Sequence, residues 1–191
     1  MYEAVVIGVS AGGMSALKEI FFGLPASFPL PVAVVQHVSP DGDSFLAEYL
    51  SRHSAMMVKE AEDKEIMVAG TGYLAPAGYH LLIDPGRILS LSVDPPVNYS
   101  RPSIDMLFES AAVALGPRLI GVVLTGASGD GSAGLRAIKE RGGIAVVQDP
   151  ATAESPYMPR AAIEAAAVDY VVELAQIAPL LLRLSGENNA G

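Results

Sequence analysis

Cysteine is absent from the sequence. Disulfide bonds, thiolate catalysis and cysteine-based metal sites are therefore excluded, while the redox compartment is left open. Clusters of lysine and arginine are missing too, and the formal net charge is -9. Because neutralising phosphates requires clustered basic side chains, a nucleic-acid partner is not expected. An acidic balance of this kind is typical of a soluble protein.

Long hydrophobic runs are also missing. The N-terminal apolar run, Ala4 to Val9, is far shorter than a signal peptide or a membrane helix requires. Glu3 stands where a signal peptide would carry Lys or Arg. We therefore expect a cytoplasmic protein that is not inserted in a membrane.

The apolar residues of the chain are arranged in short runs. The chain has 191 residues, of which 51% are hydrophobic and 17% charged, a composition that suits one domain with a sheet buried on both faces. We expect this domain to cover residues 1–184. The small and polar residues 185–191 are expected to form a flexible tail.

The apolar runs alternate with segments of helical periodicity. Strands are predicted at 4–9, 31–36, 119–125, 143–148 and 169–174, and helices at 13–23, 43–53, 103–115, 131–141, 158–167 and 175–184. HLLID and ILSLSV flank Pro85-Gly86-Arg87, which predicts an antiparallel hairpin at one edge. The sequence thus indicates an α/β fold of three layers: a mostly parallel, doubly wound sheet of about seven strands, with helices on both faces.

The first predicted strand runs into a glycine-rich turn, GVSAGG at 8–13, and then a helix. This pattern matches the G-x-S-x-G elbow, which exposes a nucleophilic serine where a strand turns into a helix. Ser10 is therefore a candidate nucleophile, and the helix N-terminus offers N–H groups to a developing oxyanion. Ser10 could instead only cap the helix. A dinucleotide fingerprint fits poorly, because Ser10 replaces its middle glycine.

His37 and Asp130 follow two other predicted strands. Carboxyl ends of parallel strands meet at one edge of a sheet, so His37 should lie near Ser10. Asp130 lies in another glycine-rich turn, Gly126 to Gly131, which lacks the lysine of a phosphate-binding P-loop. Alone, Asp130 could cap a helix or bind Mg²⁺. His53 and His80 are interpreted as structural residues.

Together the three turns supply a nucleophile, a base and an orienting carboxylate. Such triads are defined by roles and geometry rather than by chain order. The order Ser10, His37, Asp130 differs from that of the α/β-hydrolases, in which the histidine comes last. The sequence therefore predicts a serine hydrolase of another lineage.

Five ordered motifs resemble the catalytic domain of bacterial chemotaxis protein-glutamate methylesterases: GVSAGG at 8–13, QHVSP at 36–40, APAGYHLLI at 75–83, LTGASGDGSAG at 124–134 and QDPATAESPYMPRAA at 148–162. The resemblance covers almost the whole chain. It places the family's triad on Ser10, His37 and Asp130, and an oxyanion contact on the backbone of the third motif. Our hypothesis is that the backbone N–H groups of Ala11 and Ala127 hold the oxyanion. It implies neither metal nor cofactor.

The resemblance implies hydrolysis of glutamate γ-methyl esters on the cytoplasmic region of methyl-accepting chemoreceptors, and often deamidation of receptor glutamines. Similar sequences usually carry Met where this chain has Ala127 and Gly where it has Ser128. They also commonly carry an N-terminal receiver domain, so we expect a stand-alone enzyme or an excised domain. A separate receiver or kinase protein is a possible partner.

Arg101, Arg160 and Met158 are candidates for substrate binding. The two arginines could guide an acidic receptor helix, since a guanidinium recognises carboxylates with a fixed fork of donors, or could form ordinary surface ion pairs. Two other functions stay open. One is a non-catalytic chemosensory docking module, and the other is a nucleotide- or phosphate-binding regulator that uses the glycine-rich turns.

Overall fold

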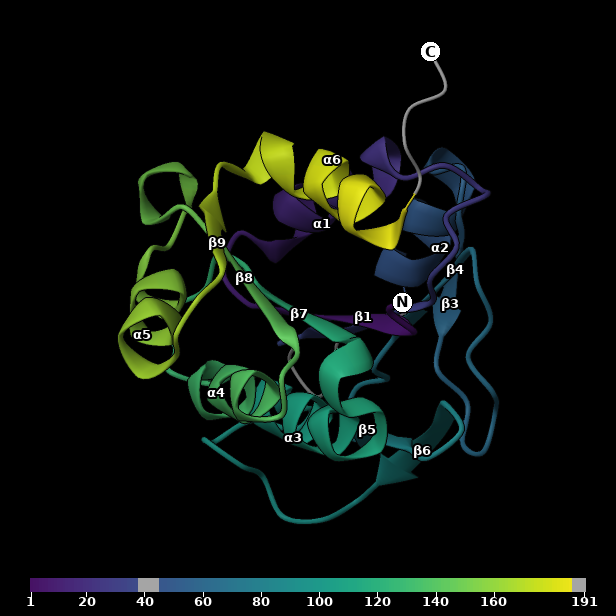
Figure 1. Ribbon diagram of the computed structural model, residues 1–191. Coiled ribbons are helices and arrows are strands. Elements are labelled where there is room, and N and C mark those ends of the chain that lie inside the picture. The colour runs from purple at the N-terminus through teal and green to yellow at the C-terminus, as the bar shows by residue number, and fades with distance from the viewer. Residues whose placement is uncertain (38–44, 187–191) are drawn as a thin grey trace.

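Seven parallel strands form the central sheet of the computed structural model, which describes residues 1–37 and 45–186. The strand order is β3-β4-β2-β1-β7-β8-β9 (Figure 1). The strands are β1 (Ala4–Val9), β2 (Val32–Gln36), β3 (Met57–Glu60), β4 (Thr71–Leu74), β7 (Leu119–Val123), β8 (Ile144–Gln148) and β9 (Tyr170–Val172). The predicted parallel sheet is confirmed.

Helices cover both faces of this sheet (Figure 1). One face carries α1 (Gly13–Gly23), α2 (Phe45–His53) and α6 (Leu174–Ser185), and the other carries α3 (Ile104–Leu115), α4 (Ser132–Glu140) and α5 (Tyr157–Ala165). Two short 3₁₀ helices lie at Gly116–Arg118 and Pro150–Thr152. The fold therefore has the three layers that the sequence predicted.

Strand β1 shows why a continuous apolar run was needed. Val5, Ile7 and Val9 point into the core under α1 and α6, while Ala4 and Val6 point into the core under α3. Side chains alternate along a strand, so a strand with helices on both faces must be apolar at every position. All six residues of β1 are buried.

The edge strand β3 and its neighbour β4 were not among the five predicted runs. β3 reads MVKE and buries only Val58, so it lacks the apolar run of an internal strand. β4 is fully buried but contains Gly72, where an added Cβ would lie 2.6 Å from the Phe21 ring. The close approach of the Phe21 ring requires glycine at a position where a strand would usually carry a β-branched residue. The strand pattern is therefore interrupted, and β4 was not recognised from the sequence.

The predicted hairpin forms, with β5 (His80–Asp84) antiparallel to β6 (Ile88–Ser92). It is a two-stranded sheet of its own rather than an edge of the large sheet, which corrects the predicted placement. Leu81, Ile83 and Leu89 are buried in the core beneath α3, and the Ile83 N–H donates to Ser110 Oγ at 3.1 Å. The hairpin therefore packs its apolar face on a helix.

Two predicted boundaries fall at the limits of the described residues. The predicted helix 43–53 is seen as α2 from Phe45 onward, and its first two positions lie outside the described residues. α6 extends to Ser185, one residue into the predicted tail, and Gly186 ends it in a left-handed conformation. Residues 187–191 lie outside the described part, so the flexible tail stays a prediction. No described helix has the length and apolar character needed to cross a membrane.

The sheet order fixes where a site can form. From β1 the chain moves outward through β2 on one side, and it later returns to β7 on the other side of β1. In doubly wound sheets the crevice at such a switch point, beyond the carboxyl ends of the strands, is where ligands bind. Ser10, His37 and Asp130 all follow strands at this point.

Candidate active site

Ser10 lies in the tight turn between β1 and α1. Its N–H donates to the Thr125 carbonyl at 3.0 Å, and its own carbonyl accepts from the Gly13 N–H at 2.9 Å. Gly12 adopts a left-handed conformation, φ 79°, which glycine tolerates without strain. The turn thus presents the Ser10 hydroxyl at the switch point, as the elbow pattern predicted.

The three predicted triad residues meet in one hydrogen-bonded chain. Ser10 Oγ lies 3.2 Å from His37 Nδ1, and His37 Nε2 lies 2.7 Å from Asp130 Oδ2. With Nε2 donating to the carboxylate, Nδ1 is left as the acceptor for the serine proton. The His37 side chain is 13% exposed and that of Asp130 is fully buried. Proton transfer can therefore occur at a partly dehydrated site.

Asp130 is surrounded by donors. Its Oδ1 accepts from Asn98 Nδ2, Ser103 Oγ and the Asp105 N–H, at 2.9, 2.9 and 3.1 Å. Its Oδ2 accepts from the Ile104 N–H at 2.6 Å in addition to His37. Backbone N–H groups at the start of α3 thus hold the carboxylate where the helix dipole favours an anion.

The protonation of Asp130 follows from these contacts. Burial disfavours its charged form, but the hydrogen bonds from His37, Asn98 and the two backbone N–H groups outweigh burial and lower its pKa to about 2. Neighbouring Asp105 behaves differently, because burial, together with the charge of Asp130, raises its pKa. Asp130 is therefore the carboxylate that stays ionised beside His37.

Two residues that sequence analysis missed fix the turns relative to one another. Gln36 Nε2 donates to the carbonyls of Ser10, at 3.0 Å, and His37, at 3.1 Å. Thr125 Oγ1 donates to the Ala11 carbonyl at 2.8 Å and accepts from the Ser155 N–H at 2.9 Å. Both residues end or follow strands at this edge, which was the available signal. Their role is to hold the serine turn.

The backbone N–H groups of Ala11 and Ala127 lie in the turns that follow β1 and β7. Within residues 1–37 and 45–186, neither N–H has an intramolecular acceptor. The loop of Ala127 lies against the nucleophile, since a Cβ added at Gly126 would be 2.9 Å from Ser10 Cβ. Free N–H groups beside a serine can stabilise the oxyanion of acyl transfer.

Gly126 supports a first prediction. Its added methyl group would also meet Met158 Sδ at 2.5 Å. Because Met158 is fully buried, we expect Gly126→Ala to push the loop and Ser10 apart and to lower kcat by about 10²-fold, the usual cost of a displacement near 1 Å. The matched control is Gly129→Ala, in the same loop, whose added Cβ would meet no atom within 4 Å. Equal kcat values for the two variants would contradict the close packing.

The other predicted site residues differ in placement. Met158 is fully buried beneath the loop of residues 126–131, and its contact with substrate stays a prediction. Arg101 donates from Nη1 to the carbonyls of Val93 and Asp94, at 2.9 and 3.1 Å, so it ties together the chain after β6. Arg160 is exposed on α5 and stays a candidate.

His53 and His80 occupy structural positions. His53 Nδ1 lies 2.8 Å from the Tyr49 carbonyl on the surface of α2. His80 is fully buried, accepts from the Ser103 N–H at 3.1 Å and lies 3.1 Å from the Pro95 carbonyl. It thereby supports the start of α3, which holds Asp130. The described residues contain no cluster of three or more His, Asp or Glu side chains arranged to hold a metal ion.

Comparison with known protein families extends the resemblance seen in the motifs. The model of the CheB methylesterase family matches residues 5–181. A protein of Leptospira interrogans, named provisionally as a protein-glutamate methylesterase/protein-glutamine glutaminase, is 51% identical over 187 residues, which are 98% of this chain and 97% of that protein. The two chains are thus alike along nearly their whole lengths.

A longer relative and a solved structure show the same similarity. The protein-glutamate methylesterase FrzG of Myxococcus xanthus is 42% identical over 95% of this chain, which spans only 54% of FrzG. The crystal structure of the Thermotoga maritima CheB methylesterase catalytic domain superposes with a TM-score of 0.93 at 36% identity, covering 96% of this chain and 99% of that domain. The likeness therefore extends to three dimensions.

Proposed function

This chain belongs to the CheB methylesterase family, and on that premise we propose that Ser10, His37 and Asp130 hydrolyse γ-methyl esters of glutamate residues in a protein. The observation that carries the proposal is the hydrogen-bonded chain from Ser10 Oγ through His37 to buried Asp130. A hydroxyl, an imidazole and a carboxylate in this order are the parts of a serine hydrolase.

The first half of the reaction forms the bond between enzyme and substrate. Ser10 Oγ attacks the ester carbonyl carbon while His37 Nδ1 takes its proton. The negative charge moves to the carbonyl oxygen, which the N–H groups of Ala11 and Ala127 bind. Asp130 remains ionised and stabilises the imidazolium through Nε2.

The second half regenerates the enzyme. His37 returns the proton to the departing methoxide oxygen. Methanol leaves, and the glutamyl group stays bound to Ser10 as an ester. Water then attacks the carbonyl carbon of this acyl-enzyme as His37 accepts one of its protons. The bond between Ser10 Oγ and the acyl carbon breaks, His37 returns the proton to Ser10 Oγ, and the substrate protein leaves with a glutamate carboxylate. If the leaving group is ammonia from a glutamine amide, the same steps produce deamidation.

The protein substrate we propose is the cytoplasmic region of a methyl-accepting chemoreceptor, so the reaction takes place in the cytoplasm. Similarity to proteins named as glutamate methylesterases supports this choice. Arg160, exposed on the same helix that begins beside the Gly126 loop, is the residue we propose for contact with acidic positions of the receptor.

The test measures methanol released from a methylated chemoreceptor cytoplasmic fragment. The wild-type protein should release methanol, and a serine-directed fluorophosphonate should stop the release while adding its mass to the peptide that contains Ser10. Unmethylated fragment is the blank. Release that continues after complete labelling of Ser10, or labelling confined to another serine, would contradict the proposal. No release from a fragment that a known methylesterase cleaves would favour a docking module.

A further inference from the structure

The turn Val97 to Ser100 lies beside the triad and was not expected to take part in it. Val97 and Ser100 exchange backbone hydrogen bonds of 3.1 and 2.9 Å, and the two residues between them, Asn98 and Tyr99, have φ values of 51° and 62°. Two consecutive left-handed residues are typical of a type I′ turn, and Asn tolerates that conformation well. The turn alone would therefore explain an asparagine at this position.

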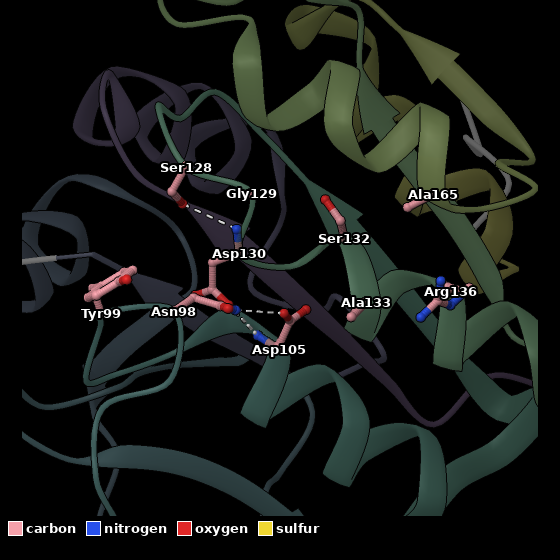
Figure 2. Close-up of a pocket in the computed structure, with 10 residues that line it drawn as sticks. All are labelled: Asn98, Tyr99, Asp105, Ser128, Gly129, Asp130, Ser132, Ala133, Arg136 and Ala165. Atoms are coloured by element: carbon pink, nitrogen blue, oxygen red, sulfur yellow. Dashed lines mark hydrogen bonds between the residues drawn. The ribbon is translucent and has the colours of Figure 1, made fainter.

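The side chain of Asn98 does more than fit the turn. Its Nδ2 donates to Asp130 Oδ1 at 2.9 Å and to Asp105 Oδ2 at 2.9 Å (Figure 2). An amide –NH₂ group has two hydrogens, so one group can serve both carboxylates at once. Tyr99, the other residue at the tip, points its side chain into solvent and is 104% exposed. The turn thus sends one side chain inward and one outward.

The two carboxylates need such a bridge. Asp105 is 7% exposed and Asp130 is fully buried, and like charges close together in a protein interior repel strongly. Asp105 itself holds the start of α4, because its Oδ1 accepts from the N–H groups of Gly131, at 3.0 Å, and Gly134, at 2.7 Å. Asp105 therefore fixes the chain that follows Asp130, and Asn98 fixes Asp130 to Asp105.

We propose that Asn98 is a positioning residue of the Ser10 site: its amide holds the Asp130 carboxylate toward His37 by tying it to Asp105. Of the donors to Asp130, Ser103, Ile104 and Asp105 all belong to the start of α3. Asn98 approaches from a different segment, and it lines a cavity of about 520 Å³ together with Asp105 and Asp130. It limits rotation of the Asp130 carboxylate.

The inference rests on the proposed function and predicts a change in pH dependence. Without the amide, the charge of Asp130 is less dispersed and stabilises the imidazolium of His37 more strongly. Other charged groups near this pair are Asp105 beside Asp130, Glu109 on α3, whose charge acts on Asp105, and Arg136 on α4, which lines the same cavity. The acid limb of the rate profile should therefore move to higher pH.

The test compares two substitutions in one turn, Asn98→Gly and Tyr99→Gly. Glycine accepts a left-handed backbone, so both variants keep the turn, and each removes one side chain. The readout is the rate at which a fluorophosphonate modifies Ser10: Ser10 Oγ bonds to phosphorus, fluoride leaves, and His37 takes the serine proton. This rate needs the triad but no receptor.

We expect Asn98→Gly to lower the rate at neutral pH by about tenfold, as for the loss of one hydrogen bond to a charged group, and to shift its acid limb upward. Tyr99→Gly should match the wild type in both. Asn98→Asp, which puts a third carboxylate between the other two, should lower the rate further.

Equal rates and pH profiles for Asn98→Gly and Tyr99→Gly would overturn the inference and leave Asn98 as a turn residue only. The inference also fails if Asn98→Gly loses activity only in proportion to a lower unfolding temperature. If the wild type is neither labelled at Ser10 nor releases methanol, the proposed function itself fails. That result is distinct from labelling of Ser10 at a rate that Asn98→Gly does not change.

Discussion

Replacing Ser10 by alanine should lower kcat for methyl-ester hydrolysis by about 10⁶-fold, the usual cost of losing the nucleophile of a serine hydrolase. No other hydroxyl is hydrogen-bonded to His37 within the described residues. The fold should survive, because the backbone of Ser10 keeps its bonds to Thr125, Gly13 and Gln36. Methanol release and circular dichroism, measured on the same sample, check both expectations.

A second serine provides the control for this result. Ser128 lies in the Gly126 loop, where its Oγ accepts a long hydrogen bond of 3.3 Å from the Asp130 N–H. Ser128→Ala removes a hydroxyl at the same edge of the sheet without touching His37, and we expect less than a tenfold change in kcat. If Ser10→Ala retained activity within tenfold of the wild type, Ser10 would not be the nucleophile.

Asp130→Asn should lower kcat by about 10⁴-fold and also destabilise the protein. The catalytic loss arises because a neutral amide no longer holds and stabilises the His37 imidazolium. The loss of stability has a separate cause. Every partner of Asp130 is a donor, so the –NH₂ group of asparagine must face at least one of them, at a cost of about 1–3 kcal/mol.

The pH dependence of unfolding tests the second effect. The pKa of Asp130 is about 2 in the folded protein against an ordinary 3.8, so the unfolded chain binds the proton more readily. Asp130 therefore stabilises the fold by about 2 kcal/mol above pH 4, and this contribution is lost as the pH falls toward 2.

Because Asp130→Asn lacks this contribution, the difference in unfolding free energy between wild type and variant should shrink as the pH falls from about 5 to 2. Urea titrations at several pH values measure it. A difference that stays constant over this range would mean that the carboxylate is not held as an anion in the folded protein.

The sequence predicted the triad because each member follows a strand. Ser10, His37 and Asp130 lie at the carboxyl ends of β1, β2 and β7, and the rule that parallel strands share one such edge brings them together. No comparable rule brings Asn98 to Asp130, which is 32 residues further along the chain. Its segment has neither helical nor strand periodicity, so its contact depends on tertiary structure alone.

Two further features also depend on tertiary packing. Met158 belongs to one of the motifs, but membership of a motif does not distinguish a residue that touches substrate from one that supports a loop. Only burial does so. The hairpin was recognised from its turn chemistry, whereas its placement depended on whether the apolar face of β5 met a strand or α3. Local patterns describe elements, and packing decides their neighbours.

The central position of β1 has a consequence for the stage of unfolding at which the site loses its structure. β1 is hydrogen-bonded to β2 on one side and β7 on the other, and Ser10 continues this ladder through its N–H bond to Thr125. Amide hydrogens in such a strand exchange with solvent only when the whole domain opens, whereas edge strands such as β9 can fray alone. The nucleophile is therefore anchored in the last part of the protein to open, and local fluctuations at the sheet edges leave it in place.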